Sequence, residues 1–228
     1  MPNDRSAFIE FLLDSNALQF GEFTLKSGRI SPYFFNIARF RTGARLARLG
    51  EFYAAAVEAA APRATIAFGP AYKGIPLALT TAMAMSRAGR DMGYLFDRKE
   101  AKTHGDTGRF VGQVPEPGDR VVLVDDVITD GETKLIAVNL LREAFGCPID
   151  AVVIAFNRME QDAQGRDAVA AFSATTGIPV VALLTLTELE AALAEPRLTL
   201  PSDAPERETV LSGIRDYRSR YGTAVARG

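Results

Sequence analysis

The strongest constraint on the fold of this chain is an alternation, from residue 64 onward, of short apolar runs with segments of helical spacing. The runs are apolar almost throughout rather than at every second position, which is typical of strands buried on both faces of a parallel sheet. Their alternation with helices predicts an α/β fold in which helices cover the sheet and ligands bind beyond the carboxyl ends of the strands. The expected strands are 64–69, 93–97, 120–126, 151–157 and 178–186.

The segments outside this alternation are expected to belong to the same domain. Residues 20–40 break into short polar and aromatic pieces between two predicted helices, so they form a small loop-and-strand region rather than part of the main sheet. A chain of 228 residues is long enough to bury one large core. We therefore expect a single domain over 1–228, with a small N-terminal region that we call the hood (about 1–40), a core (about 41–200) and a C-terminal helix (about 205–221).

Composition excludes several classes of protein. The 26 basic and 28 acidic residues give a net charge of −2, which argues against bulk binding to nucleic acid or to an anionic membrane. The single cysteine, Cys147, cannot form an internal disulfide, and His104 is the only histidine, so a transition-metal site is not expected. The N-terminus lacks the basic region of a signal peptide, and no run approaches the roughly 18 apolar residues of a membrane span. We expect a cytoplasmic protein.

The turn after strand 64–69 has the features of an anion site. It reads GPAYKGIPLA, and it presents Tyr72 and Lys73 immediately before a predicted helix. Free backbone N–H groups and the positive end of the helix dipole favour an anion there, and a lysine adds a full charge. The spacing of a P-loop is absent. The alternative is an ordinary strand-to-helix turn with a solvated lysine.

Strand 120–126 ends in two carboxylates, in the stretch VVLVDDVITDGET. Adjacent acids repel each other, so Asp125 and Asp126 indicate a partner such as a polyol or a cation. The turn behind them offers backbone N–H groups and the hydroxyls of Thr129 and Thr133, which suit a phosphate monoester. Acceptors for a diol followed by donors for a phosphate describe a site for a ribose 5-phosphate. The alternative is that Asp126 only caps the turn.

A third cluster, RKEAKTHG over 98–105, is polar and shows no period; we call it the lid. The lid carries up to four cationic donors in Arg98, Lys99, Lys102 and His104. One interpretation is a solvated charged loop. The other is a mobile segment that closes over a highly anionic substrate and excludes water.

Four motifs in this order and at these spacings, LKSGRISPYFFN, GPAYKGIPLA, RKEAKTHG and VVLVDDVIT, resemble those of the orotate phosphoribosyltransferases of pyrimidine biosynthesis. The last motif alone would mark only the wider type I phosphoribosyltransferase group, whereas the first and third are more specific. The resemblance spans roughly residues 12–158. It implies the type I phosphoribosyltransferase fold, a mainly parallel central sheet flanked by helices with the hood at its N-terminus.

The resemblance also implies a reaction and a set of binding residues. The reaction transfers ribose 5-phosphate from 5-phosphoribosyl 1-diphosphate (PRPP) to N1 of orotate and releases diphosphate. Lys102, His104, Asp125 and Asp126 are the expected catalytic residues. The expected PRPP-binding set adds Lys26, Tyr72, Lys73, Arg98, Lys99, Val127, Ile128, Thr129, Asp130, Gly131, Glu132 and Thr133. Orotate is expected to contact Phe34, Phe35, Thr129 and Arg158; without the motifs, the two phenylalanines would be core residues and Arg158 a surface charge.

The resemblance further implies Mg²⁺ and a homodimer. Mg²⁺ is expected to be held mostly by the oxygens of PRPP and by water, so no dedicated protein metal site is predicted. In the family the lid reaches across a twofold dimer, and Lys99 would then serve the partner's site.

Two departures from the family pattern concern the phosphate site. The family usually reads DDVITAGT, whereas this chain has Asp130 in place of alanine and Glu132 in place of threonine. Because an inward acid would oppose a phosphate, we expect both side chains to face solvent or the first helical turn. The backbone N–H groups of 130–133 and the Thr133 hydroxyl would then hold the phosphate.

Two other functions remain as alternatives. One is a purine phosphoribosyltransferase of the same fold, which the YFFN segment and the lid argue against. The other is a regulatory protein that binds PRPP and nucleic acid and has lost catalytic activity. The net charge and the cationic lid argue against it.

Overall fold

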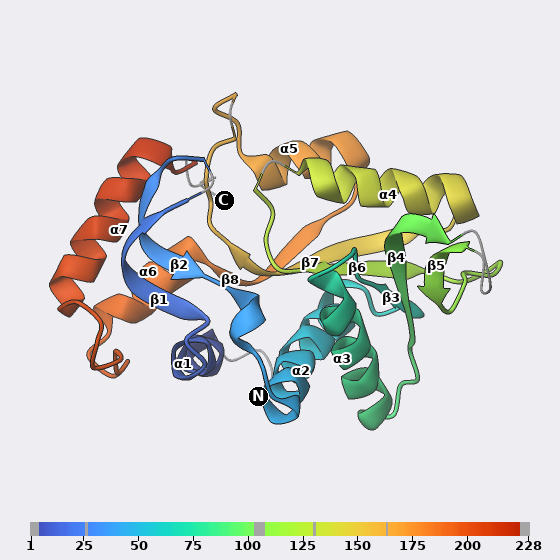
Figure 1. Ribbon diagram of the computed structural model, residues 1–228, viewed down its shortest axis with the longest axis horizontal. Helices are drawn as coiled ribbons and strands as arrows, with labels where there is room; N and C mark the ends of the chain where they lie inside the picture. The colour runs from blue at the N-terminus through green and yellow to red at the C-terminus, as the bar shows by residue number, and fades with distance from the viewer. Residues whose placement is uncertain (1–4, 26, 103–107, 130, 163, 224–228) are drawn as a thin grey trace.

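A six-stranded sheet forms the centre of the computed structural model, which describes residues 5–25, 27–102, 108–129, 131–162 and 164–223 (Figure 1). The strand order is β5-β4-β3-β6-β7-β8, and all neighbours are parallel except β4 and β5. The strands are β3 (Ile66–Phe68), β4 (Gly93–Lys102), β5 (Gly108–Gly112), β6 (Val121–Asp125), β7 (Ile149–Asn157) and β8 (Val180–Thr185). The parallel α/β sheet expected from the alternation is confirmed.

Helices cover both faces of this sheet. In Figure 1, α2 (Gly43–Ala60) and α3 (Gly74–Arg87) lie below it, and α4 (Glu132–Phe145) and α5 (Ala168–Thr176) lie above it. Alternate residues of β6 point to opposite faces of the sheet. Val122 and Val124 belong to the core on the side of α2 and α3, whereas Leu123 belongs to the core on the side of α4 and α5. Burial on both sides explains why the strands are apolar throughout.

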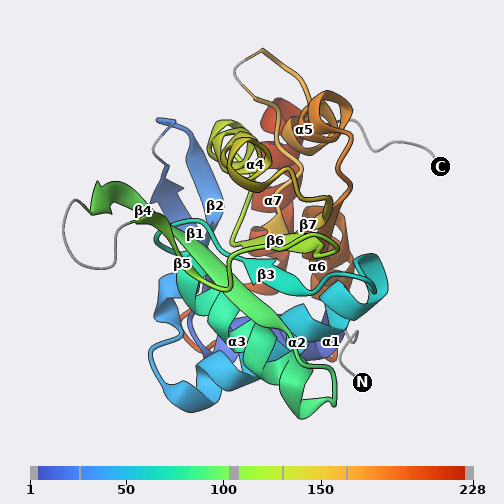
Figure 2. The same ribbon diagram turned by 90° about the vertical axis from the view of Figure 1, so that its right-hand side faces the viewer.

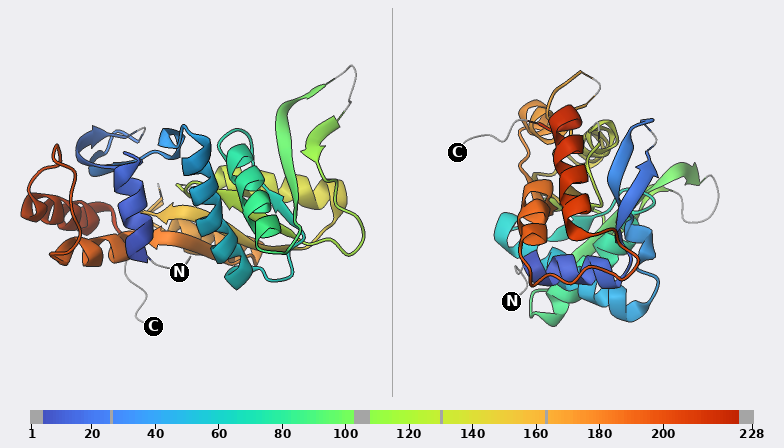
Figure 3. Two further views of the ribbon diagram at one scale, coloured as in Figure 1. Left: turned by 90° about the horizontal axis from the view of Figure 1, so that it is seen from below. Right: turned by 90° about the vertical axis from the view of Figure 1, so that its left-hand side faces the viewer.

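The hood forms a separate layer against the C-terminal helix. After α1 (Arg5–Asp14), strands β1 (Leu18–Thr24) and β2 (Ile30–Phe35) pair antiparallel as a two-stranded sheet, followed by a short 3₁₀ helix, η1 (Ile37–Arg39). Helix α6 (Leu186–Ala194) leads through a loop to α7 (Arg207–Tyr221), which packs against β2 (Figures 1 and 3). The helices of the part of the chain that is described lack the length and apolarity to cross a membrane.

The structure corrects the expectation that residues from 98 onward form an aperiodic loop. Strand β4 continues to Lys102, and β5 returns antiparallel to it, with Asp97 opposite Phe110 and Lys102 opposite Gly108. This hairpin projects from the body of the protein (Figures 2 and 3). The backbone of β4 runs past the end of its parallel partner β3, where Leu95 is opposite Phe68, so it leaves the covered sheet that imposes an apolar pattern. Phe110 of β5 packs back against Phe68 and Phe145.

Candidate active site

Two carboxylates are fixed at the carboxyl end of β6. Asp125 and Asp126 are both buried, and each carboxylate accepts a hydrogen bond from the backbone N–H of the following residue. Asp126 N–H donates to Asp125 Oδ1, and Val127 N–H donates to Asp126 Oδ1, both at 2.9 Å. The Tyr53 hydroxyl of α2 donates to the Asp125 carbonyl at 2.7 Å, and backbone N–H groups of β7 donate to the Asp126 carbonyl. Main-chain hydrogen bonds thus hold the backbone on which both side chains stand.

Each carboxylate also has its own lysine. Lys73 Nζ lies 2.6 Å from Asp126 Oδ2, and Lys134 Nζ lies 2.6 Å from Asp125 Oδ2. Burial raises the pKa of Asp125, the Lys134 ammonium opposes that shift, and the charge of Asp126 adds to it. The sequence analysis missed Lys134. The available signal was its place on the buried stripe of α4, where Ala137, Val138 and Leu141 are the other members.

The turn between β3 and α3 brings Lys73 to this site. A side chain on Gly69 would collide with the Gly74 carbonyl, so the close return of the chain requires glycine there. The Ala71 N–H donates to Asp97 Oδ1 of β4 at 2.9 Å, which ties the turn to the neighbouring strand. Tyr72 is 66% exposed and Lys73 precedes the first residue of α3, so both side chains stand at a helix N-terminus as expected.

The loop from β6 into α4, residues 127–133, is the expected phosphate loop. Ile128 is buried in the core that α4 covers, so it can contact a ligand only through its backbone, whereas Val127 is partly buried against the core on the other face of the sheet. Thr129 and Thr133 are exposed, and Gly131 has a φ of 79° just before the helix begins. Asp130 lies outside the described residues.

Glu132 lies in the first turn of α4 and is exposed, as the sequence analysis expected. We therefore expect the double substitution Asp130→Ala and Glu132→Thr to change the Kd for PRPP by less than about tenfold, because the exposed charge of Glu132 contributes about 1 kcal/mol or less and the side chain of Asp130 is expected from the sequence to face away from the phosphate. Isothermal titration of both proteins with PRPP measures this. A tightening beyond tenfold would show that the acids oppose the phosphate.

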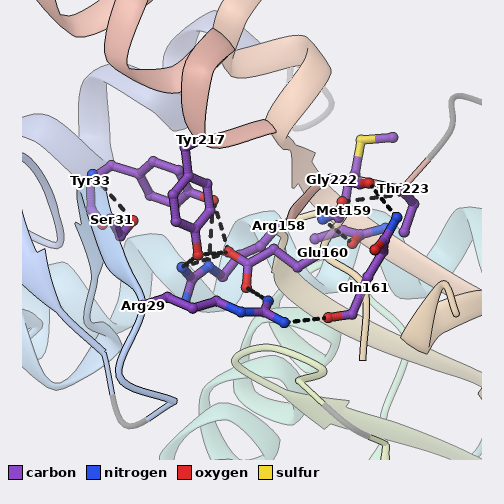
Figure 4. A network of polar contacts seen from close by, with 11 residues as sticks. Arg29, Ser31, Tyr33, Arg158, Met159, Glu160, Gln161, Tyr217, Gly222 and Thr223 are labelled. Carbon is purple, nitrogen blue, oxygen red and sulfur yellow. Dashed lines mark hydrogen bonds and ion pairs between the residues drawn. The ribbon is translucent and has the colours of Figure 1, made fainter. Parts of the chain in front are cut away.

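Arg158 follows β7 and lies in a partly buried polar network that links three distant segments (Figure 4). Its Nη2 is 2.7 Å from Glu160 Oε1, and its guanidinium carbon lies 5.2 Å from the centre of the Tyr33 ring of β2. Glu160 also accepts from the Tyr217 hydroxyl of α7 at 3.0 Å and pairs with Arg29 at 3.5 Å. The sequence analysis identified Arg158 but missed these partners.

The protonation states of Tyr33, Tyr217 and Arg158 leave a positively charged guanidinium held in place by its neighbours. Burial raises the pKa of Tyr33 above its usual range, with Arg158 opposing and Glu160 reinforcing the shift. Burial and the Glu160 carboxylate raise the pKa of Tyr217 to about 12. Both phenols are therefore protonated donors at neutral pH, and Arg158 keeps its positive charge in a largely water-excluded position.

Phe34 and Phe35 point to opposite sides of the hood. Phe34 stacks with Phe23 of β1 at 5.4 Å between ring centres, whereas Phe35 meets Phe156 edge to face at 5.6 Å. Consecutive residues of a strand alternate between its two faces, so β2 does not bring both rings to one surface. Tyr33 and Phe35 both contact Phe156, which lies two residues before Arg158 in the sequence.

Several expected site residues lie where no side chain is described. Lys26 and His104 fall outside the described residues, and for Lys99 and Lys102 only the backbone, in β4, is described. Arg98 is described: its Nη1 donates to the Gly108 carbonyl at 3.2 Å, across the hairpin.

Comparison with known proteins identifies the family. No protein-family model matches the chain. The orotate phosphoribosyltransferase of Xanthomonas campestris pv. campestris is 45% identical over 229 residues, covering 98% of each chain, and that of Chromohalobacter salexigens is 48% identical over 228 residues, covering 96% of this chain and 94% of the relative. The crystal structure of the orotate phosphoribosyltransferase of Francisella tularensis superposes with a TM-score of 0.80 at 37% identity, over 95% of this chain and 100% of that one. The type I phosphoribosyltransferase fold is thereby confirmed, and the chain belongs to the orotate phosphoribosyltransferase family.

Proposed function

We propose that this protein transfers ribose 5-phosphate from PRPP to N1 of orotate, giving orotidine 5′-phosphate and diphosphate in pyrimidine biosynthesis, as a single cytoplasmic domain. The identity of 45% over nearly the whole chain is the observation that carries this proposal. The paired carboxylates at the end of β6, the loop into α4 and the partly buried guanidinium of Arg158 support it, because together they match the diol, the phosphate and the carboxylate of the two substrates.

The ribose 5-phosphate binds at the end of β6. Each carboxylate oxygen of Asp125 and Asp126 has one donor in the structure, which leaves lone pairs for the 2′- and 3′-hydroxyls of the ribose. Backbone N–H groups of the phosphate loop, with the hydroxyls of Thr129 and Thr133, hold the 5′-phosphate at the positive end of the α4 dipole.

The diphosphate binds at the start of α3, in contact with Tyr72 and Lys73, with Lys26 and the lid completing its surroundings. Lys73 is paired with Asp126, but its side chain is 57% exposed and is free to turn toward a diphosphate. Orotate lies between Phe35 and the end of β7, where the planar fork of Arg158 matches a carboxylate.

Catalysis rests on stabilising charge that develops as the bond from C1′ to the diphosphate breaks. The ribose ring gains positive character, which the negative charges of Asp125 and Asp126, bound to its hydroxyls, stabilise. The departing diphosphate gains negative charge, which Lys73, Arg98, Lys99, Lys102 and His104 stabilise. Lys102 and His104 make the contacts that form mainly in the transition state.

Mg²⁺ accompanies PRPP in this mechanism. Among the described residues no three Asp, Glu, His or Cys side chains group as metal ligands, and the two carboxylates nearest the ribose each carry a lysine. The ligands of the ion would be mainly the oxygens of PRPP and water, since Mg²⁺ dehydrates reluctantly. When bound, the ion neutralises part of the charge on the diphosphate.

A homodimer with shared lids accounts for the length of β4. Leu95 pairs with Phe68 at the end of β3, and from there β4 continues to Lys102, which reaches roughly 20 Å beyond β3 at about 3.3 Å per residue. A lysine side chain spans only a fraction of that distance. An extension of this length is long enough for the lid of one subunit to reach a neighbouring subunit, and we include in the proposal that it serves the active site of its partner.

The function is tested by measuring turnover with PRPP and Mg²⁺ and either orotate, adenine or hypoxanthine as the acceptor. We expect orotate alone to be consumed. Turnover of a purine base would show the alternative enzyme of the same fold, and tight PRPP binding without turnover of any acceptor would indicate a regulator.

A further inference from the structure

Lys134 occupies a position where the fold favours an apolar residue. The buried stripe of α4 consists of Lys134, Ala137, Val138 and Leu141, at the spacing of a core-facing helix surface. The Lys134 side chain is only 10% exposed. It also lies in the first turn, where the helix dipole disfavours a positive charge. Burial and the helix dipole both disfavour the positive charge of Lys134. The ion pair with the Asp125 carboxylate offsets these two costs.

A buried ion pair of this kind is weak support for stability. Well-packed apolar residues in place of such a pair are often as stabilising or more so, because removing two charges from water is costly. Local departures from packing rules of this sort concentrate at functional sites. The reason for a lysine at this position is therefore to be sought in what Asp125 does.

The two lysines at the end of β6 differ in their freedom to move. Lys73 stands on a turn with more than half of its side chain exposed, whereas Lys134 is enclosed beneath α4. When Lys73 turns toward the diphosphate of bound PRPP, Asp126 loses its lysine. Of the described residues, Lys134 then remains as the fixed positive charge beside two adjacent carboxylates.

We propose that Lys134 is a positioning residue for PRPP, a permanent counter-charge that keeps Asp125 ionised and oriented while Lys73 is engaged with the diphosphate. Among the described residues, the ionisable groups around Asp125 are Asp126 on β6, Lys73 from the turn before α3, Tyr53 on α2 and Lys134 itself. Tyr53 donates to the Asp125 carbonyl and carries no charge, since burial raises its pKa well above the usual value. The proposal rests on the proposed function, because it assigns Asp125 to the ribose hydroxyls.

The test compares the kinetics of Lys134→Met and Lys134→Gln with those of the wild type between pH 5.5 and about 9. This range is chosen because the pKa of the Asp125 carboxyl is expected to rise when its cation is removed. Both variants lack the charge, while glutamine retains a donor for Asp125. We expect the KM for PRPP to rise by up to about tenfold at the acid end of this range, the equivalent of one pKa unit, and to approach the wild-type value at its alkaline end, with the KM for orotate unchanged throughout.

The pH profile separates this role from a structural one. Removing the cation raises the pKa of Asp125 further, and PRPP binds the ionised form. The kcat/KM for PRPP of both variants is therefore expected to begin falling at a higher pH than that of the wild type as the solution is made more acidic. If Lys134→Met fails to fold, Lys134→Gln retains the test, since it keeps a polar group in the same volume.

Two comparisons sharpen the result. In an Asp125→Asn background, Lys134→Met is expected to add no further rise in the KM for PRPP, because its target is already uncharged. Arg142→Met removes a positive charge about 12 Å further along α4 and is expected to leave both KM values unchanged. Wild-type KM and pH profile in both Lys134 variants, or equal effects with and without Asp125, would overturn the proposal. Absence of orotate turnover in the wild type would instead reject the proposed function.

Discussion

Replacing Arg158 by methionine is expected to raise the KM for orotate by about a hundredfold while the KM for PRPP stays near its wild-type value. Arg158 is a partly buried guanidinium, 16% exposed, just after β7, and truncating one partner of a desolvated charge pair costs about 2–5 kcal/mol, roughly 30- to 4,000-fold in affinity. Steady-state kinetics with each substrate varied in turn measures both constants.

Two further variants distinguish loss of recognition from loss of structure. Arg158→Lys keeps the charge but loses the planar fork, so its KM for orotate is expected to fall between those of the wild type and the methionine variant. Arg166→Met removes an exposed guanidinium that pairs with Asp162 in the same loop, and it is expected to leave both KM values unchanged. An unchanged KM for orotate in folded Arg158→Met would exclude Arg158 from the orotate site.

Replacing Lys102 by alanine is expected to lower kcat by about 10²- to 10³-fold, with a much smaller change in either KM. Removing one donor that stabilises developing charge has an effect of this size. Contacts that form mainly in the transition state lower kcat and kcat/KM together and leave ground-state binding almost intact. The measurement is the consumption of orotate at saturating PRPP and Mg²⁺. Equal activity of variant and wild type would remove Lys102 from the mechanism.

Mixing two inactive variants tests whether the lid is shared. In a hybrid of Lys102→Ala with Asp126→Asn, a lid that crosses the dimer leaves one site with both native residues, and about a quarter of all sites in a statistical mixture become active. A lid that serves its own subunit leaves every site with one defect. Recovery of activity on mixing supports the shared lid, and its absence in a mixture shown to exchange subunits contradicts it.

The sheet and the end of β6 were predictable from sequence because their signals are local. Strands apolar on both faces can only be central strands of a covered sheet, and adjacent acids at the end of such a strand stand at the edge where ligands bind. The β4–β5 hairpin was not predictable in this way, because its outer part projects from the core and its residues carry no period.

The missed site residues share one physical cause: their partners are far away in sequence. Lys134 looks like a solvated lysine until the fold brings it within 2.6 Å of Asp125. Glu160 lies in a polar stretch, and only the packing of β2 and α7 against the end of β7 surrounds it with Arg29, Tyr33 and Tyr217. Alternation along β2 was a local signal that Phe34 and Phe35 face opposite sides of that strand, and the sequence analysis did not use it.

A crystal structure of the protein with orotidine 5′-phosphate bound is the most direct test of the site proposed at the end of β6. The nucleotide is expected to have its ribose hydroxyls on Asp125 and Asp126, its phosphate on the backbone of residues 130–133 and its base carboxylate on Arg158. A nucleotide bound with its ribose away from both aspartates would contradict the account.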